Sequence, residues 1–242
     1  MKLLIVGLGS MGKRRARLIR GIDGAIRLAG VDSAPARRQE ALDLGLVGAA
    51  YPDLPAALDA FAPDAALVCT APLAHADLIT RLLTAGLPVF TELNLVADGY
   101  DRNLALAAEK RVPLFLSSTM LYRRETRYIK QQVAAFGKPV HYIYHIGQYL
   151  PDWHPWENYQ NFFVGNARTG GVREILGIDL PWLLDAFGPV DPAAVTVRTD
   201  TISGLGLPYP DCATLLLPHK SWAMGVLAAD VVSPKACLLY TS

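Results

Sequence analysis

The first half of the chain alternates short apolar runs with amphipathic stretches. Apolar runs of this length are typical of buried strands, and the stretches between them are typical of crossover helices. The pattern therefore predicts an α/β domain built on a doubly wound parallel sheet. The expected strands are residues 3–6, 26–31, 65–69, 88–91 and 112–117, and the expected helices are residues 11–22, 36–44, 74–85 and 100–110.

The pattern changes after residue 118. Residues 121–136 predict a long linking helix, and the chain beyond it is richer in aromatic residues, prolines and β-branched runs. Strands of a mixed or antiparallel sheet are expected at residues 140–148, 193–202, 213–217 and 221–232. One helix is expected over residues 171–187, where Pro181 should kink it or mark its true start.

Composition limits the class of protein. With 242 residues, of which 52% are hydrophobic and 19% charged, the chain can bury a core in one large domain or two small ones. Its net charge of +1 gives no field that would recruit nucleic acid or an anionic membrane. We therefore expect a small molecule or another protein as its partner.

Cysteines and apolar runs indicate a cytoplasmic protein. Cys69, Cys212 and Cys237 include no CxxC pair, so they predict neither a disulfide scaffold nor a four-cysteine zinc site. No segment reaches the ~18 uninterrupted apolar residues that a membrane-spanning helix requires. The apolar N-terminus is interrupted by glycine at residue 7 and is too short for a signal peptide.

The sharpest local motif is Gly7-Leu8-Gly9-Ser10-Met11-Gly12, between an expected strand and an expected helix. In such a loop Gly7 permits the tight turn, Gly9 lets the backbone approach a pyrophosphate, and Gly12 lets the helix pack closely on the strand. Ser10 and Met11 open the helix, whose N-terminus faces the anion. The loop predicts a dinucleotide site.

Asp32 supports this interpretation and bears on the choice of cofactor. It lies at the end of the second expected strand, where a carboxylate accepts hydrogen bonds from the adenosine ribose and repels a 2′-phosphate. Asp32 therefore favours NAD. The alternative is NADP, because Ser33, Arg37 and Arg38 follow and could hold a 2′-phosphate if the carboxylate turned aside.

Further motifs extend along the chain. They are Thr70-Ala71-Pro72-Leu73-Ala74-His75 after a strand, Val89-Phe90-Thr91-Glu92, and Gly170-Gly171 at the start of a helix. Together with the glycine loop and Asp32, they resemble the Gfo/Idh/MocA oxidoreductases, which carry Thr-Pro-x-x-x-His at the first of these places.

The resemblance implies an N-terminal Rossmann domain, residues 1–118, and a C-terminal α+β domain with an open-faced mixed sheet, residues 119–236. It also implies that Thr70, His75 and Glu92 lie near the cofactor cleft. For His75 the alternative is a purely structural role at the start of its helix.

The sequence departs from the family twice. Where the family has Glu-Lys-Pro, this chain has Glu92-Leu93-Asn94, so the usual lysine is absent. Where the family often has Asp and His on the helix after Gly-Gly, this chain has Ile175 and Asp179. Oxidation of a hydroxyl still requires a group that takes the proton.

Candidates for that group lie in the second half of the chain. Asp179 is the first, provided that burial or the charge of Glu174 raises its pKa, and His154 is the reserve, with an ordinary pKa of about 6.5. Glu174 and Tyr149 are further candidates. The alternative is that the protein binds a cofactor without catalysis.

An aromatic loop surrounds His154. Tyr149, Trp153 and Trp156 could form a wall against a sugar ring, or the tryptophans could simply pack on the domain. Arg173 could hold a substrate carboxylate or phosphate, or pair with Glu174 on the surface. No second cluster of ligands supports a metal site.

Two functions follow as hypotheses. The first is an NAD(P)-dependent oxidoreductase that transfers a hydride to or from a sugar, nucleotide-sugar or similar polyhydroxylated substrate, as a homo-oligomer with no nucleic-acid or membrane partner. The second is a catalytically inactive dinucleotide-binding or regulatory protein on a Rossmann scaffold. Fold alone does not separate them.

The last six residues, 237–242, raise a separate point. Cys237-Leu238-Leu239-Tyr240-Thr241-Ser242 corresponds to TGT CTC TTA TAC ACA TCT, which matches a transposon-end adapter used in sequencing libraries. We expect a truncated gene fragment whose native sequence stops near Ala236. The C-terminal sheet would then lack its final strands.

Overall fold

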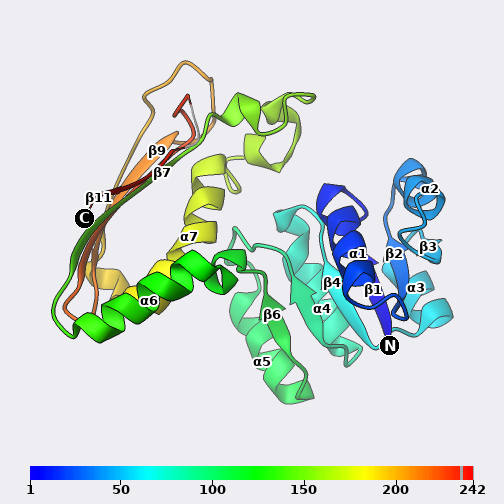
Figure 1. Cartoon of the computed structure of the whole chain (residues 1–242). Helices are drawn as coiled ribbons and strands as arrows, with labels where there is room; N and C mark the ends of the chain where they lie inside the picture. The colour runs from blue at the N-terminus through cyan, green and yellow to red at the C-terminus, as the bar shows by residue number, and fades with distance from the viewer. Residues whose placement is uncertain (235–236, 242) are drawn as a thin grey trace. The chain divides into compact units, whose positions relative to one another are not determined.

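The computed structural model describes residues 1–234 and 237–241. Contacts between residues divide the chain into two compact units, Met1–Ser117 and Ser118–Ser242 (Figure 1). Each unit has a sheet and a hydrophobic core of its own.

The first unit is built on a six-stranded sheet with the order β3-β2-β1-β4-β5-β6. All neighbouring strands are parallel. The strands are β1 Lys2–Val6, β2 Arg27–Val31, β3 Ala49–Tyr51, β4 Ala65–Val68, β5 Val89–Thr91 and β6 Leu114–Leu116. This order has its switch point between β1 and β4, which is where Rossmann folds bind dinucleotides.

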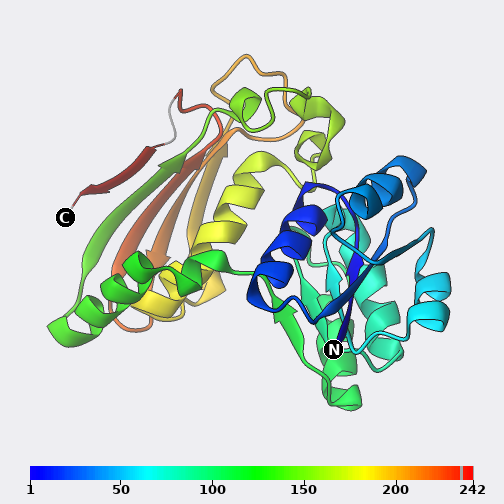
Figure 2. The ribbon, with the colours of Figure 1, turned by 45° about the vertical axis from the view of Figure 1, so that its right-hand side comes forward.

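Helices cover both faces of this sheet, as Figure 2 shows. The helices are α1 Ser10–Ile22, α2 Pro35–Asp43, α3 Leu54–Phe61, α4 His75–Thr84 and α5 Tyr100–Lys110. Alternate residues of β1 point into two hydrophobic clusters, one on each face of the sheet. Leu4 and Val6 pack with α3, α4 and α5, whereas Leu3 and Ile5 pack with α1 and α2. A strand buried on both faces has to be apolar at every position, which explains its uninterrupted sequence.

The expected doubly wound α/β fold is confirmed, but the hydrophobic pattern does not single out β3 or α3. β3 is three half-buried residues long, too short to show a period. Helix α3 begins with a local signal instead, because Asp53 Oδ1 accepts a hydrogen bond of 2.9 Å from the Ala56 N–H.

The second unit contains a five-stranded sheet with the order β11-β7-β10-β9-β8. β7 and β10 are parallel, and the other neighbours are antiparallel, so the expected mixed sheet is confirmed. The elements are α6 Arg124–Phe136, β7 His141–Gly147, α7 Gly171–Phe187, β8 Thr196–Asp200, β9 Cys212–Pro218, β10 Met224–Asp230 and β11 Cys237–Thr241. The final segment therefore pairs with β7 as a strand.

Helices α6 and α7 lie on one face of this sheet (Figure 2). Their apolar residues, among them Val133, Trp182 and Leu183, pack with Tyr144 of β7 and Leu227 of β10 in a single core. Polar groups lie in this core as well, since Tyr144 of β7 donates a hydrogen bond to Asp179 of α7.

Several element boundaries differ from the sequence prediction. The linking helix begins at Arg124, after a 3₁₀ turn over Thr119–Tyr122. The strand expected from residue 221 begins at Met224, because Trp222 adopts a left-handed conformation (φ 68°) in the turn. Pro181 does not mark a helix start, because α7 runs through it from Gly171, although proline has no N–H to donate a helical hydrogen bond.

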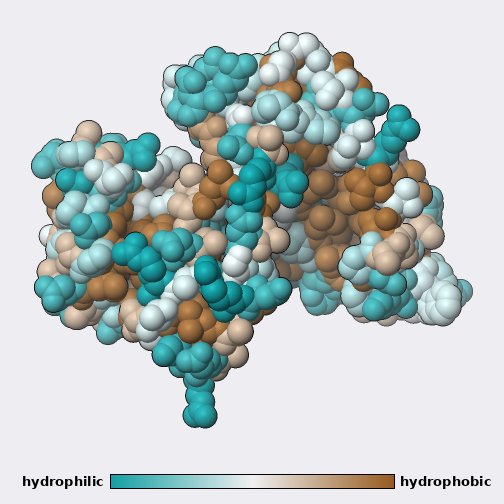
Figure 3. Space-filling view, turned by 180° about the vertical axis from the view of Figure 1, so that it is seen from behind, coloured by the Kyte–Doolittle hydropathy of each residue, from teal (hydrophilic) through white to brown (hydrophobic). Residues whose placement is uncertain are grey.

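In the part of the chain that the structure describes, no helix has the length and apolarity needed to cross a membrane. Figure 3 shows hydrophobic side chains gathered in a broad area at the right of this view and in smaller areas among hydrophilic side chains elsewhere.

Candidate functional site

The glycine loop has the geometry that a pyrophosphate requires. Gly7 has φ +97°, and a Cβ there would lie 2.8 Å from the Cys69 carbonyl carbon. A Cβ on Gly12 would lie 1.9 Å from the Gly7 oxygen. Neither position can accept a side chain, whereas a Cβ on Gly9 would meet nothing within 4 Å.

This open space lies at the N-terminus of α1. Gly9 is the residue before the helix, and no side chain caps the first turn. The first N–H groups of a helix lack partners within the helix and carry partial positive charge. The residues present therefore fit a bound pyrophosphate, with Gly9, Ser10 and Met11 beside it.

Asp32 is tied to the loop by its own hydrogen bonds. Its Oδ2 accepts from the Leu8 N–H at 2.9 Å, and its Oδ1 accepts from the Ala34 N–H at 2.9 Å. The residue is 7% exposed. Its carboxylate thus fixes the glycine loop on β2, and each oxygen keeps a lone pair for a ribose hydroxyl.

Two arginines lie near this carboxylate. Arg37 NH1 is 3.7 Å from Asp32 Oδ2 and its side chain is exposed. Arg38 NH1 donates instead to the main-chain carbonyls of Asp32 at 2.7 Å and Ser33 at 3.0 Å. Of the two, Arg37 is therefore the one available for a 2′-phosphate.

A second charged group lies on the other side of β1. The Arg15 side chain, from α1, donates through Nε to Glu92 Oε1 after β5 and through NH2 to Ser117 Oγ after β6, the latter at 3.0 Å. Its guanidinium also lies 5.2 Å from the Phe90 ring centroid. The hydrogen bond to Glu92 raises the pKa of Arg15.

Two further residues at this edge differ in chemistry. Burial, with the nearby charge of Glu92, raises the pKa of the Cys69 thiol to about 12, so the thiol stays protonated and is no nucleophile. Thr70 Oγ1 is buried and has no hydrogen-bond partner. An unpaired buried hydroxyl is costly unless a ligand or water satisfies it.

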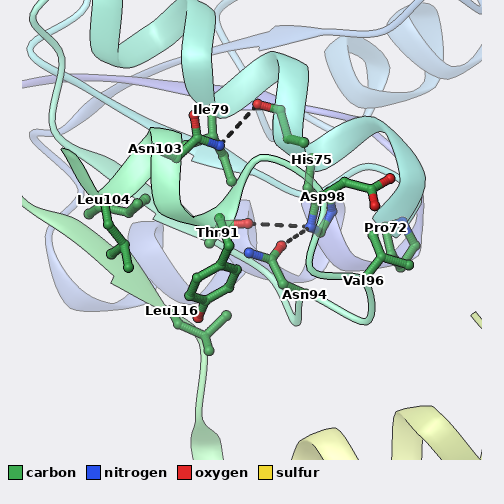
Figure 4. A pocket seen from close by; sticks show the side chains of 13 residues that line it. Pro72, His75, Ile79, Thr91, Asn94, Val96, Asp98, Asn103, Leu104 and Leu116 are labelled. Atoms are coloured by element: carbon green, nitrogen blue, oxygen red, sulfur yellow. Dashed lines mark hydrogen bonds between the residues drawn. The ribbon is translucent and has the colours of Figure 1, made fainter. Parts of the chain in front are cut away.

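His75 is 2% exposed and is engaged within the protein. Its Nε2 lies 2.9 Å from the Thr70 carbonyl oxygen and its Nδ1 lies 2.6 Å from Asn94 Oδ1. Figure 4 shows His75 and Asn94 pointing toward each other beside a small cavity between α4 and α5. These contacts make His75 a residue that positions the loops after β4 and β5.

Asp179 of the second unit is held firmly. Its Oδ1 accepts from Tyr144 OH and from Trp182 Nε1, both at 2.8 Å, while its Oδ2 is buried without a partner. Burial raises the pKa of Asp179, and the two hydrogen bonds partly oppose that shift. Burial, and not the charge of Glu174, is therefore what perturbs this carboxyl group.

Glu174 lies in the first turn of the same helix, α7. Its Oε2 and the hydroxyl of Tyr209 are both buried without a hydrogen-bond partner. Burial raises the pKa of Glu174 to about 7. The Tyr209 ring lies against the helix start, since a Cβ on Gly170 would come within 2.7 Å of it.

The aromatic loop divides into a packed part and an exposed part. Trp153 packs against the core, with its Nε1 buried and unpaired, whereas Trp156 is 77% exposed and Tyr149 is at the surface. The His154 ring stacks on Trp156 and on Phe162, with centroids 5.2 and 4.6 Å apart. The structure thus brings His154 and Trp156 together.

Two other sequence expectations concern charged groups. Arg173 is exposed on α7, whereas Glu174 has a buried carboxylate oxygen, Oε2, that accepts no hydrogen bond from any described residue. Within residues 1–234 and 237–241, no group of three or more His, Cys, Asp or Glu side chains could hold a metal ion.

Sequence reasoning missed Arg15 at the cofactor edge. Arg15 is three residues after Gly12, so both lie on the side of α1 that packs on the sheet. The available sequence signal was an arginine three residues after Gly12, next to the helix face that is expected to be buried.

Comparisons with known proteins agree with this geometry. Residues 1–117 match the model of an oxidoreductase family with an NAD-binding Rossmann fold, GFO_IDH_MocA. No curated protein matches the sequence significantly.

Solved structures share the fold of both units. A probable dehydrogenase from Thermotoga maritima is 21% identical, with a TM-score of 0.80 over 100% of this chain and 76% of that one. WlbA dehydrogenase from Chromobacterium violaceum, in complex with NADH and UDP-GlcNAcA, is 17% identical, with a TM-score of 0.82 over 97% of this chain and 68% of that one. A putative myo-inositol dehydrogenase from Sinorhizobium meliloti is 20% identical, with a TM-score of 0.79 over 99% and 71%.

At these identities the solved structures show a common fold, and the family match is confined to the first unit. Residues 1–117 are similar to the NAD-binding Rossmann domain of the Gfo/Idh/MocA oxidoreductase family.

Proposed function

We propose that the protein is an NAD-dependent oxidoreductase that transfers a hydride to or from a sugar, a nucleotide-sugar or another polyhydroxylated substrate. The observation that carries the proposal is the glycine loop, where crowded Gly7 and Gly12 flank an open Gly9 at a helix N-terminus. Such a loop accepts the pyrophosphate of a dinucleotide.

The substrate class is supported by structures with the same fold. One neighbour was crystallised with UDP-GlcNAcA, and another is described as a putative myo-inositol dehydrogenase. UDP-GlcNAcA and myo-inositol are both rich in hydroxyl groups. Tyr149, Trp153 and Trp156 remain our candidates for apolar contact with a sugar ring, and Arg173 for contact with an acidic substituent.

NAD, when bound, supplies the acceptor or donor of the hydride. The chain itself has to move the hydroxyl proton, and Asp179 is the proposed acceptor, with His154 as the second candidate. Asp179 has one oxygen fixed by Tyr144 and Trp182 and the other unpaired. A carboxylate whose pKa is raised by burial is a stronger base than an exposed one.

The proposal is tested by following NADH absorbance with a panel of sugars, nucleotide-sugars and polyols. With a substrate found, Asp179→Asn should lower turnover about tenfold or more, with cofactor affinity little changed. Asp185→Asn is the matched control, because this carboxylate of the same helix is exposed and pairs with Lys130 at 2.6 Å. Full activity in both Asp179→Asn and His154→Ala would reject both assignments.

A second candidate function is a dinucleotide-binding or regulatory protein without catalysis. Leu93 favours it, because an aliphatic side chain directly after Glu92 cannot carry a proton. No turnover on any substrate, together with intact NAD binding, would support this candidate. Increased turnover in Leu93→Lys would argue against it.

A further inference from the structure

The order of the first sheet divides the dinucleotide site into two halves. Asp32 follows β2 on one side of β1, and Glu92 follows β5 on the other side, beyond β4. The pyrophosphate position at Gly9 lies between them, at the end of β1. If Asp32 receives the adenosine ribose, the nicotinamide half has to extend toward the ends of β4 and β5.

At those strand ends the charged groups are Arg15 and Glu92. The side chains are 19% and 12% exposed, so the ion pair is mostly withdrawn from water. Desolvating two charges is costly, and a buried ion pair is weak evidence for a stabilising role. Arg15 is also bound to Ser117 and stacked near Phe90, which fixes the pair in one geometry.

Groups suited to a carboxamide lie beside this pair. Arg15 engages Glu92 through Oε1, which leaves Oε2 as an acceptor for an amide NH₂. Thr70 Oγ1, at the end of the adjacent strand, is buried without a partner and can donate to an amide carbonyl. A nicotinamide carboxamide needs one acceptor and one donor.

We propose that the Arg15–Glu92 ion pair receives the nicotinamide end of the cofactor and balances its charge, so that Arg15 positions Glu92 and sets the preference between NAD⁺ and NADH. The inference rests on the proposed function for its cofactor. It concerns residues of the first unit alone.

The charges predict opposite effects for the two side chains. The nicotinamide ring carries a positive charge in NAD⁺ and none in NADH. A carboxylate nearby favours the oxidised form, and a guanidinium favours the reduced form. Loss of Glu92 should therefore weaken NAD⁺ more than NADH, and loss of Arg15 should weaken NADH more than NAD⁺.

Calorimetric titration of the whole chain with NAD⁺, NADH and ADP-ribose tests this. ADP-ribose lacks nicotinamide, so its affinity should stay unchanged in Glu92→Gln and Arg15→Ala. The ratio of the NAD⁺ and NADH dissociation constants should shift about tenfold in opposite directions in the two variants. Arg15→Lys, which keeps the charge, should restore the ratio of the unmodified protein.

Arg20→Ala is the control, because Arg20 lies on the same helix and donates to the Leu46 carbonyl, at 2.9 Å, away from Glu92. Equal weakening of all three ligands would mean a structural pair and would overturn the inference, as would an unchanged ratio. If Arg15→Ala does not fold, Arg15→Gln replaces it. If the unmodified protein does not bind ADP-ribose, that result would instead refute the proposed function.

Discussion

The two units hold their candidate chemistry in different ways. In the first unit the dinucleotide site is mainly backbone: an open glycine, two crowded glycines and the N–H groups of a helix start. In the second unit it consists of side chains. Among described residues, the second unit has six with a buried side-chain polar atom that lacks a hydrogen-bond partner: Ser118, Trp153, His154, Glu174, Asp179 and Tyr209. In the first unit, all of whose residues are described, Thr70 alone has such an atom.

This difference determines how far the amino-acid sequence of each site can vary. A backbone site tolerates many sequences, provided that the glycines are kept, because main-chain N–H groups bind the anion whatever the side chains are. A side-chain site depends on the identity of each residue. A buried polar group that has no hydrogen-bond partner in the protein requires a ligand or a water molecule as its partner. The first unit therefore reveals its cofactor, and the second reveals polar groups that require a partner.

The largest expected effect tests whether the cofactor site is a backbone site. Gly9→Val places a side chain where the phosphates pass, so NAD affinity should fall about a hundredfold or more while the fold persists, because nothing lies within 4 Å of the new Cβ. Calorimetry and circular dichroism measure the two effects. Gly24→Val, also in open space, is the control. Unchanged affinity would refute the site.

A smaller effect is expected at the buried carboxyl group of Glu174, in the second unit. Glu174 has a folded-state pKa of about 7 against an ordinary 4.5, so the unfolded chain ionises first and stability is lost as pH rises between these values. Glu174→Gln should remove up to about 3 kcal/mol of this loss. Urea unfolding at several pH values measures it.

The control for this prediction is Asp185→Asn, which changes an exposed carboxyl of α7. It should leave the pH dependence of the unfolding free energy as in the unmodified protein. A Glu174→Gln profile parallel to that of the unmodified protein would show that Glu174 is solvated, and would remove the contrast between the units.

The smallest effect concerns cofactor choice. Asp32→Ala removes the ribose acceptor and leaves Arg37, now 3.7 Å from the carboxylate, free to pair with a 2′-phosphate. The preference for NAD over NADP should fall about tenfold. Asp32→Asn, which keeps an acceptor for the Leu8 N–H, separates the charge effect from loop disruption. A preference for NADP in the unmodified protein would contradict our interpretation of Asp32.

Local signals predicted much of the fold. The helix over residues 171–187 and the helix over residues 100–110 appear with those boundaries, since glycine and polar residues mark their ends. β3 was missed because three residues show no period, and the strand expected from residue 221 was too long because Trp222 turns the chain. Propensity alone does not reveal such turns.

The candidate site was only partly predictable. The glycine spacing and Asp32 stand close together in sequence and carry their own signal. Arg15 and Glu92 are 77 residues apart, so their contact depends on β5 lying two strands from β1. Likewise, Asp179 was chosen from its alignment, but its bonds to Tyr144 and Trp182 come from the packing of α7 on β7.

The sequence by itself determined the periodicity of the strands and helices, the glycine loop, the acidic residue after β2 and the absence of the family's lysine at Leu93. These features depend on neighbours within a few residues, where sterics and backbone hydrogen bonding act. Only the tertiary structure decided which carboxyl groups are desolvated, which are paired and which polar atoms are left without a partner. Those properties depend on side chains far apart in the chain, since burial and electrostatic pairing arise only when separate elements pack together.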